Sequence, residues 1–407
     1  MYIYKAGVVG GGAMGAEIAQ AITFSGLPVI LKDVDDARVQ QGLDTIRKIY
    51  QRRVDKGKMS PEDMASKINL VSGATTYDAF KDVDVVVEAV PEKMELKQRI
   101  FRDLDAACPP NAILASNTSS LSISALGAST QRPAKVVGMH FFYPAHIMKL
   151  VEVIPGLDTA EETVSDIIGF AESLRKLPIR VNECPGFLVN RLLMPYLNEA
   201  AFCLQEGVAT AQNIDKTMAG FGFPMGPCTL VDALGFDVCH DVVVILEQDY
   251  GSRMHPADLW GAIYEKGRLG VKRGAGFYLY GDRAGQPDAE MEAILRSVRK
   301  PQAAPPRPFS PNRLMLPMIN EAILCLEERV SSAADIDLAM LAGIGFPQDK
   351  AGILHYADEL GLDAVLQELT QLAQRYGSRF WPAPLLRRKV GAGHLGKQVK
   401  RGFFEYP

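Results

Sequence analysis

The beginning of the chain restricts the possible fold more than any other part of the sequence. The apolar run KAGVVG (residues 5–10) is typical of a short buried strand, and GGAMGAEIAQAITFSG then supplies a glycine turn and a helix. A second strand, LPVILKDVD, contains Asp33 near its end. Gly10, Gly12 and Gly15 form a G-x-G-x-x-G string, whose glycines permit a tight turn, a close backbone approach to pyrophosphate and close helix packing. This order of elements predicts a Rossmann-like, dinucleotide-binding domain.

The residues around the turn predict how the dinucleotide is bound. Ala13 and Met14 begin the helix, where backbone N–H groups and the positive end of the helix dipole favour phosphate. Asp33 follows Gly10 by 23 residues, near the spacing of about 20 expected for an acid that binds the adenosine ribose hydroxyls. Because a carboxylate there repels a ribose 2′-phosphate, the predicted cofactor is NAD rather than NADP. The alternative is a fold of the same shape that binds nothing.

The rest of the sequence divides into an α/β part and a helical part. Strand-like runs at residues 83–90, 112–116, 135–142 and 149–154 alternate with helical patterns, which predicts a mostly parallel sheet. Helical patterns then dominate to the end of the chain. The expected fold is an α/β Rossmann-like NAD-binding domain over residues 1–182, followed by two tandem all-α helical domains.

An internal repeat divides the helical part into two modules. NRLLMPYLNEA, which begins at Asn190, matches NRLMLPMINEA, which begins at Asn312, at an offset of 122 residues. Later matches have an offset of 126 after small insertions. The first module is predicted to span residues 183–282 and the second module residues 309–407. Between them, the proline-rich segment 283–308 is predicted to be a semi-rigid linker.

Two ionisable residues lie within apolar, strand-like runs of the α/β part. His140 follows KVVGM, and Glu152 interrupts LVEVI. Ionisable groups are rarely buried without a partner, so an antiparallel hairpin would let the carboxylate bind one ring nitrogen and leave the other for substrate. Histidine suits proton transfer because its pKa lies near neutrality. The alternative is two polar residues with purely structural roles.

Two further polar clusters are candidates for the site. SNTSSLSIS, residues 116–124, follows a strand and offers hydroxyl and amide groups, although some of these residues are expected to cap a helix. Asn190 lies within an apolar helix, where a buried amide needs a partner. That partner could belong to a neighbouring helix, and the equivalent Asn312 supports such a packing role for at least one copy.

The motifs together identify a resemblance that covers essentially the whole chain. VVGGGAMGAEIA, VVVEAVPEKMELKQRIF, ASNTSSLSI, HFFYPAHIMKLVEV and PGFLVNRLLMPYLNEA resemble, in order and spacing, the motifs of the L-3-hydroxyacyl-CoA dehydrogenases of fatty acid β-oxidation. The resemblance implies NAD-dependent oxidation of (S)-3-hydroxyacyl-CoA to 3-ketoacyl-CoA. It also implies that His140 is the base and Glu152 its partner, and that Ser119 and Asn190 contact the reacting oxygen.

The same resemblance implies further properties. Glu92, Lys97 and Asn117 are expected beside the nicotinamide ribose or ring. The tandem modules resemble the dehydrogenase part of multifunctional β-oxidation proteins, without their hydratase domain. Because single-module relatives are dimers through this domain, we expect an intramolecular pseudo-dimer of the two modules, in a chain that is a monomer or a dimer. Tyr143 departs from the family pattern HFFNP or HFFSP, so it is expected to alter the choice of acyl chain.

Charge and composition limit the possible partners. In the basic helix TIRKIYQRRVDKGK, Arg52 and Arg53 are candidates to bind the phosphates of coenzyme A, although a solvated helix face is the alternative. A net charge of −4 argues against nucleic acid, and no apolar run approaches the roughly 18 residues of a membrane span. The six cysteines are scattered without C-x-x-C, which predicts no metal site and favours the reducing cytoplasm.

Two alternative functions remain open at this point. One is a related NAD-dependent dehydrogenase of free hydroxy acids or sugar acids, a change of substrate that Tyr143 would suit. The other is a non-catalytic binding protein that retains the NAD fold, against which the complete set Ser119, His140, Glu152 and Asn190 argues.

Overall fold

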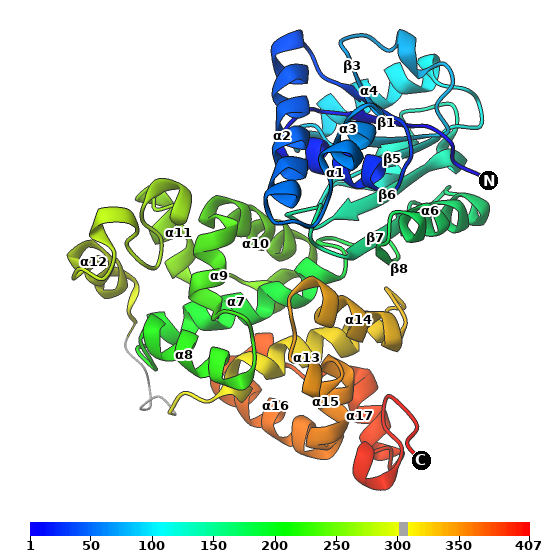
Figure 1. Cartoon of the computed structure of the whole chain (residues 1–407). Helices are drawn as coiled ribbons and strands as arrows, with labels where there is room; N and C mark the ends of the chain where they lie inside the picture. Colours follow the sequence, from blue (N-terminus) through cyan, green and yellow to red (C-terminus); the bar gives the residue numbers. More distant parts are fainter. Residues whose placement is uncertain (301–307) are drawn as a thin grey trace. The chain divides into compact units, whose positions relative to one another are not determined.

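The computed structural model describes residues 1–300 and 308–407 (Figure 1). These residues form two compact units, Met1–Phe187 and Leu188–Pro407. The first unit is α/β and the second is helical, which confirms the predicted fold class. Among the residues described, no helix has both the length and the apolar content needed to cross a bilayer.

The first unit ends later than residue 182, where the sequence places the boundary. Glu183 accepts hydrogen bonds from the Ser122 hydroxyl (2.7 Å) and from the Ser124 backbone N–H (3.1 Å). These contacts connect the segment after the last strand to the α/β unit. The division therefore comes after Phe187.

One sheet forms the centre of the first unit, with the strand order β3-β2-β1-β4-β5-β6-β7-β8. The strands are β1 (Ala6–Val9), β2 (Val29–Lys32), β3 (Val71–Ala74), β4 (Val85–Glu88), β5 (Ile113–Ser116), β6 (Val136–Phe141), β7 (Leu150–Pro155) and β8 (Leu177–Arg180). All neighbouring strands are parallel except β6 and β7, which confirms the mostly parallel prediction. The edge strands β3 and β8 were not predicted, because neither shows an apolar run.

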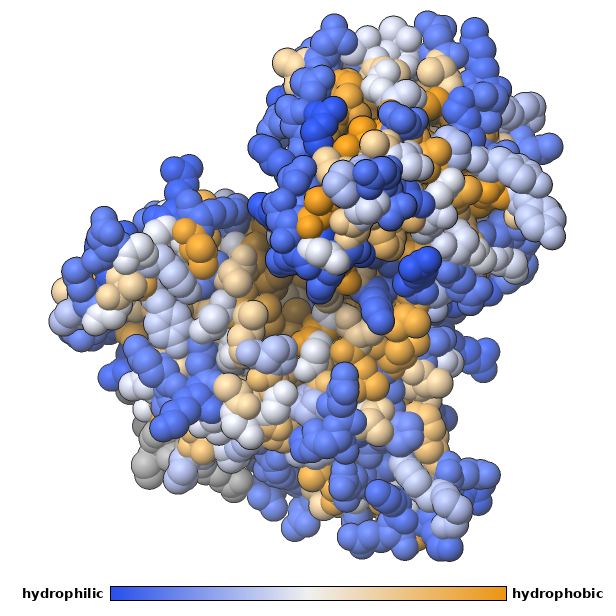
Figure 2. Space-filling view, in the orientation of Figure 1, coloured by the Kyte–Doolittle hydropathy of each residue, from blue (hydrophilic) through white to orange (hydrophobic). Residues whose placement is uncertain are grey.

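Helices pack against this sheet and bury its apolar strands. They are α1 (Ala13–Phe24), α2 (Asp36–Asp55), α3 (Pro61–Ile68), α4 (Met94–Ala107), α5 (Ile123–Gly127) and α6 (Glu161–Ser173). One core joins Val8 and Val87 of the sheet to Ile18 of α1, Tyr50 of α2 and Phe170 of α6. Burial of these side chains supplies most of the stabilisation that holds the strand ends, and hence the candidate site, in place. Hydrophilic residues cover much of the visible surface of both units (Figure 2).

The second unit repeats one helical module. The first module contains α7 (Val189–Gln205), α8 (Ala211–Phe221), α9 (Pro227–Leu234), α10 (Phe236–Tyr250) and α11 (Asp258–Glu265); the second contains α13 (Pro311–Glu327), α14 (Ala333–Gly343), α15 (Ile353–Leu360), α16 (Leu362–Tyr376) and α17 (Pro384–Gly391). The bounds of the first two pairs differ by 122 residues and those of the last three by 126. The inserted residues therefore lie between α14 and α15.

A buried aspartate closes each module in the same way. Asp232 accepts hydrogen bonds from the backbone N–H groups of Phe277 (2.8 Å) and Tyr278 (2.9 Å). Asp358 makes the two equivalent bonds in the second module, at 2.9 and 3.0 Å. The repeat thus extends from the helix pattern to individual hydrogen bonds.

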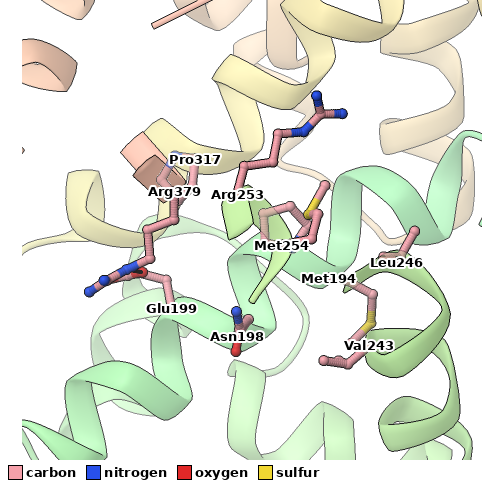
Figure 3. Close-up of a pocket in the computed structure, with 10 residues that line it drawn as sticks. Met194, Asn198, Glu199, Val243, Leu246, Arg253, Met254, Pro317 and Arg379 are labelled. Carbon is pink, nitrogen blue, oxygen red and sulfur yellow. Dashed lines mark hydrogen bonds and ion pairs between the residues drawn. The ribbon is translucent and has the colours of Figure 1, made fainter. Parts of the chain in front are cut away.

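The two modules meet through α7 and α13, where ion pairs form reciprocally. Arg191 of α7 lies 2.7 Å from Glu321, and Arg313 of α13 lies 2.5 Å from Glu199. Arg379 of the second module is 2.8 Å from Glu199, and the two side chains lie together beside a small cavity of about 20 Å³ (Figure 3). Because equivalent residues exchange partners, the contact has the self-complementary pattern of an isologous interface.

The structure differs from the predicted linker between the modules. Within segment 283–308, residues Ala289–Val298 form helix α12, which has no equivalent in the second module. The Asp288 side chain caps this helix, and Met291 and Ile294 are buried on one face of it. The proline-rich residues 301–307, on which the linker prediction mainly depends, lie outside the described residues.

Candidate active site

The glycine turn after β1 has the properties that the sequence predicts. Gly10 has a φ of +107°, a conformation that glycine adopts without strain. A Cβ on Gly15 would lie 1.8 Å from the Gly10 carbonyl oxygen, so glycine is required for α1 to pack this closely. A Cβ on Gly12 would meet no atom within 4 Å, so the start of α1 is open. Ala13 and Met14 form this open first turn, whose N–H groups have no helical partner and favour pyrophosphate.

Asp33 lies against this turn, directly after β2. One carboxylate oxygen accepts a hydrogen bond from the Gly11 N–H (2.6 Å), and the other accepts from the Val34 N–H (2.6 Å). Each carboxylate oxygen can accept a further bond, so the ribose hydroxyls of an adenosine bound at the turn would find an acceptor here. The residues present therefore fit the adenosine end of NAD.

His140 and Glu152 form a dyad. They are directly opposite in the antiparallel pairing of β6 and β7, and the distance from His140 Nδ1 to Glu152 Oε2 is 2.6 Å. Glu152 is fully buried and His140 is 7% exposed, while the rings of Phe142 and Phe187 lie 4.6 and 5.9 Å from the imidazole. A carboxylate at Nδ1 favours the tautomer whose Nε2 can accept a proton, and it stabilises the imidazolium that results.

Ser119, Glu92 and Lys97 come together at the carboxyl ends of β4 and β5. The Ser119 N–H donates to Glu92 Oε1 (2.9 Å), and Lys97 Nζ lies 3.2 Å from Glu92 Oε2. The Thr118 hydroxyl also donates to Glu92. Burial alone would raise the pKa of the Glu92 carboxyl, but Lys97, Thr118 and Ser119 outweigh burial and lower this pKa below its ordinary value. Glu92 is thus an anion that fixes the backbone at Ser119.

Glu88, the last residue of β4, is a member of this cluster that the sequence analysis missed. Its carboxylate accepts hydrogen bonds from Lys97 Nζ, the Ser116 hydroxyl and the Val90 N–H, each at 2.7 Å. Glu88 is fully buried and Lys97 is 1% exposed. The available signal was the one that identified Glu152: a carboxylate in an apolar strand. Glu88 fixes Lys97, which in turn pairs with Glu92.

Asn117 connects this cluster to the strand that carries the histidine. Its side-chain oxygen accepts a hydrogen bond from the Phe141 N–H at 2.9 Å. The bond joins the carboxyl ends of β5 and β6, one residue from His140. Asn117, predicted beside the nicotinamide, therefore also restrains the dyad.

The predicted residues Arg52 and Arg53 line a cavity of about 400 Å³, called here the basic cavity. None of the described residues that line this cavity is acidic. Its cationic side chains come from three places in the chain: Arg52, Arg53, Lys56 and Lys58; Lys149; and Arg175 and Lys176. Burial lowers the pKa of Lys176 to about 8, although Glu17 opposes this shift. Such a concentration of donors favours a phosphate-bearing ligand.

Two predicted residues are not brought to the dyad by contacts within the first unit. Tyr143 follows His140 closely in sequence, but its side chain is 65% exposed. Asn190 belongs to the second unit, near the start of α7. Its counterpart Asn312 donates a hydrogen bond to Glu368 at 3.0 Å, which is the packing role considered for this pair. The contribution of Asn190 to the site stays a prediction.

Comparison with known families covers both units. Residues 5–184 match the model of the 3-hydroxyacyl-CoA dehydrogenase NAD binding domain. Residues 186–280 and 309–406 both match the 3-hydroxyacyl-CoA dehydrogenase C-terminal domain. NAD is therefore the cofactor, as predicted. Within the described residues, no group of three His, Cys, Asp or Glu side chains could hold a metal ion.

Individual relatives agree with these matches. The fatty acid oxidation complex subunit alpha of Pseudomonas syringae pv. tomato is 39% identical over 402 residues, which is 96% of this chain and 55% of that protein. The chain thus spans about half the length of the curated relatives it matches. The 3-hydroxybutyryl-CoA dehydrogenase structure from Escherichia coli K12 is similar with a TM-score of 0.87 and 30% identity, and covers 96% of this chain and 99% of that chain. The (S)-3-hydroxybutyryl-CoA dehydrogenase of Ralstonia eutropha is 40% identical, with a TM-score of 0.68, over 69% of this chain and all of that one.

Proposed function

The chain belongs to the 3-hydroxyacyl-CoA dehydrogenase family, and we propose that it oxidises (S)-3-hydroxyacyl-CoA to 3-ketoacyl-CoA as a step of fatty acid β-oxidation. The observation that carries the proposal is the 2.6 Å contact between His140 and Glu152 at the end of the sheet that binds NAD. A buried imidazole paired with a carboxylate is a general base suited to the removal of a hydroxyl proton.

The reaction separates one hydride and one proton from the alcohol. NAD, when bound, supplies the acceptor for the hydride that leaves C3. His140 Nε2 takes the proton of the C3 hydroxyl, so that the oxygen forms a carbonyl. Glu152 stabilises the imidazolium through Nδ1. The Ser119 hydroxyl and the Asn190 amide are proposed to bind the reacting oxygen and hold it toward the histidine.

The basic cavity supports coenzyme A as the carrier of the acyl group. Coenzyme A bears a pyrophosphate and a 3′-phosphate, and Arg52 and Arg53 lie at the end of α2 among five further cations. A dehydrogenase of free hydroxy acids or sugar acids would leave this cavity without a ligand. We propose that the basic cavity binds the phosphates of coenzyme A and that the acyl chain lies near the exposed Tyr143.

The second module is proposed to replace the partner subunit of a dimer. The reciprocal pairs Arg191–Glu321 and Arg313–Glu199 connect the modules as an isologous interface would connect two chains. We propose a monomer or a dimer in which each chain has one site, built with Asn190 and not with Asn312. Truncation after residue 300 would then expose α7 and cause dimerisation or aggregation, whereas a monodisperse, active truncate would contradict the proposal. We propose a cytoplasmic location, since no disulfide bond joins the cysteines of the described residues.

The activity is tested by following NADH absorbance with the whole chain. Acetoacetyl-CoA and free acetoacetate are compared as substrates of the reverse reaction. We expect rapid NADH oxidation with the CoA ester and negligible oxidation with the free acid. Activity confined to free acids would transfer the assignment to the hydroxy acid dehydrogenases, and turnover of neither would favour a binding protein.

A further inference from the structure

Two buried charged side chains form hydrogen bonds with the backbone of the turn between the two strands that carry the dyad. Residues 142–149, the β6–β7 turn, join His140 to Glu152. The Ala145 N–H donates a hydrogen bond to Glu17 Oε2, and the Ala145 carbonyl accepts one from Lys176 Nζ. Ala145 is fully buried, Glu17 is 6% exposed and Lys176 is 8% exposed. One peptide residue is therefore fixed from both sides by opposite charges.

Each of these charges lies beside a different candidate binding feature. Glu17 lies in α1, two residues after Gly15 of the dinucleotide turn. Lys176 lines the basic cavity and also donates to the Met148 carbonyl at 2.7 Å. The β6–β7 turn thus has contacts with α1, which follows the dinucleotide turn, and with the lining of the basic cavity.

The residue before Lys176 has an unusual backbone conformation. Arg175 follows α6 and has a φ of 60°, a left-handed conformation that normally favours glycine at a helix C-terminus. Its side chain lines the basic cavity as a second cation, with the guanidinium carbon 5.6 Å from the centre of the Phe24 ring. The segment 175–176 therefore serves the cavity as well as the fold.

We propose that Glu17 and Lys176 are positioning residues for the dyad, and that phosphate in the basic cavity strengthens their hold on the β6–β7 turn. The proposal rests on the function proposed above, since it takes the phosphate from the CoA part of the substrate. An anion beside Lys176 favours its charged form, and a charged donor binds the Ala145 and Met148 carbonyls more tightly than a neutral one. Phosphate binding would thereby contribute to turnover at a distance from the reacting carbon.

The charged groups around Lys176 give the mechanism a pH signature. Arg175, Lys149, His146 and the cations of α2 line the same cavity, and the carboxylate of Glu17, which lies 3.3 Å from His146, acts on Lys176 from α1. Burial lowers the pKa of Lys176 to about 8, and Glu17 opposes this shift. Since kcat/KM reports ionisations of the free enzyme, its alkaline limb should lie near pH 8 and should depend on Glu17.

The test follows oxidation of (S)-3-hydroxybutyryl-CoA and of (S)-3-hydroxybutyryl-pantetheine, which lacks the phosphates. We expect the wild-type enzyme to show the higher kcat with the CoA ester. Lys176→Met should lower that kcat about tenfold, within the range for small misplacements of catalytic groups, and should remove most of the difference between the substrates. Arg180→Met, which breaks an exposed ion pair with Glu161, is the matched control and should change neither value.

Glu17→Gln provides a second variant, because glutamine can still accept the Ala145 hydrogen bond. The alkaline limb of kcat/KM should then lie at a lower pH than in the wild-type enzyme, because the Glu17 carboxylate that raises the Lys176 pKa is gone. The inference would be overturned if the alkaline limb of the Glu17→Gln enzyme stayed at the wild-type pH, or if the Lys176→Met enzyme kept the wild-type ratio of kcat between the two substrates. Either result would leave the proposed function in place. A wild-type enzyme that oxidises neither ester would overturn the proposed function and this inference with it.

Discussion

Replacement of Arg313 by methionine tests whether the ion pairs between the modules stabilise the helical unit. Arg313 is 6% exposed and Glu199 is 2% exposed, with 2.5 Å between their nearest charged atoms. Removal of one member of a buried pair typically costs about 3–5 kcal/mol, because the other charge stays buried. Arg379 still lies 2.8 Å from Glu199, so we expect the lower end, about 3 kcal/mol.

The expected change is measurable by calorimetry of the whole chain. For a unit of this size, about 3 kcal/mol corresponds to a fall of roughly 6–12 °C in the melting temperature of the helical transition. A second change, Glu199→Leu in the Arg313→Met protein, should recover part of the loss, because it removes a buried carboxylate that has lost one of its two partners, while Arg379 keeps Glu206 at 3.1 Å. Arg180→Met should leave the melting temperature nearly unchanged. A fall of less than about 2 °C for Arg313→Met, or a double variant less stable than the single one, would contradict this role of the Arg313–Glu199 pair.

Three further predictions concern the candidate site. Asp33→Ala should weaken NAD binding and narrow its advantage over NADP, measured by fluorescence titration; a wild-type preference for NADP would contradict the ribose assignment. Asn190→Ala should lower kcat by about 10²-fold while Asn312→Ala mainly lowers the melting temperature, and equal effects on kcat would show that the modules share the role. Glu88→Gln should raise the Kd for NADH several-fold without a change in fold by circular dichroism, whereas unchanged affinity would make the Glu88–Lys97 pair purely structural.

The sequence predicted those parts of the molecule that depend on local pattern. The glycine turn and the strand before it follow from a spacing within one segment. The repeat follows from two segments that match at a fixed offset. The His140–Glu152 contact was predicted because two polar residues stood out from apolar strands, and the antiparallel register confirms the hairpin. Helix α12 was hidden because prolines and charges dominate the segment around it.

Features assembled from distant segments could not be predicted in the same way. Lys149, Arg175 and Lys176 join Arg52 only through the fold, so the basic cavity has no signature in any one stretch of sequence. The hydrogen bond between Ala145 of the β6–β7 turn and Glu17 joins residues 128 positions apart in the chain. Glu88 is different, since its strand position was visible, and its partners Ser116 and Lys97 become apparent only in the sheet.

Turnover of (S)-3-hydroxybutyryl-CoA by the His140→Gln enzyme tests directly whether His140 is the base of the proposed NAD-dependent oxidation. Glutamine keeps a polar side chain in the buried strand but cannot accept the proton, so the fold and the NAD affinity should survive. We expect kcat to fall by about 10²–10⁴-fold, the range for loss of general acid–base catalysis. A His140→Gln enzyme with intact NAD binding and a near-normal kcat would show that His140 is not the base.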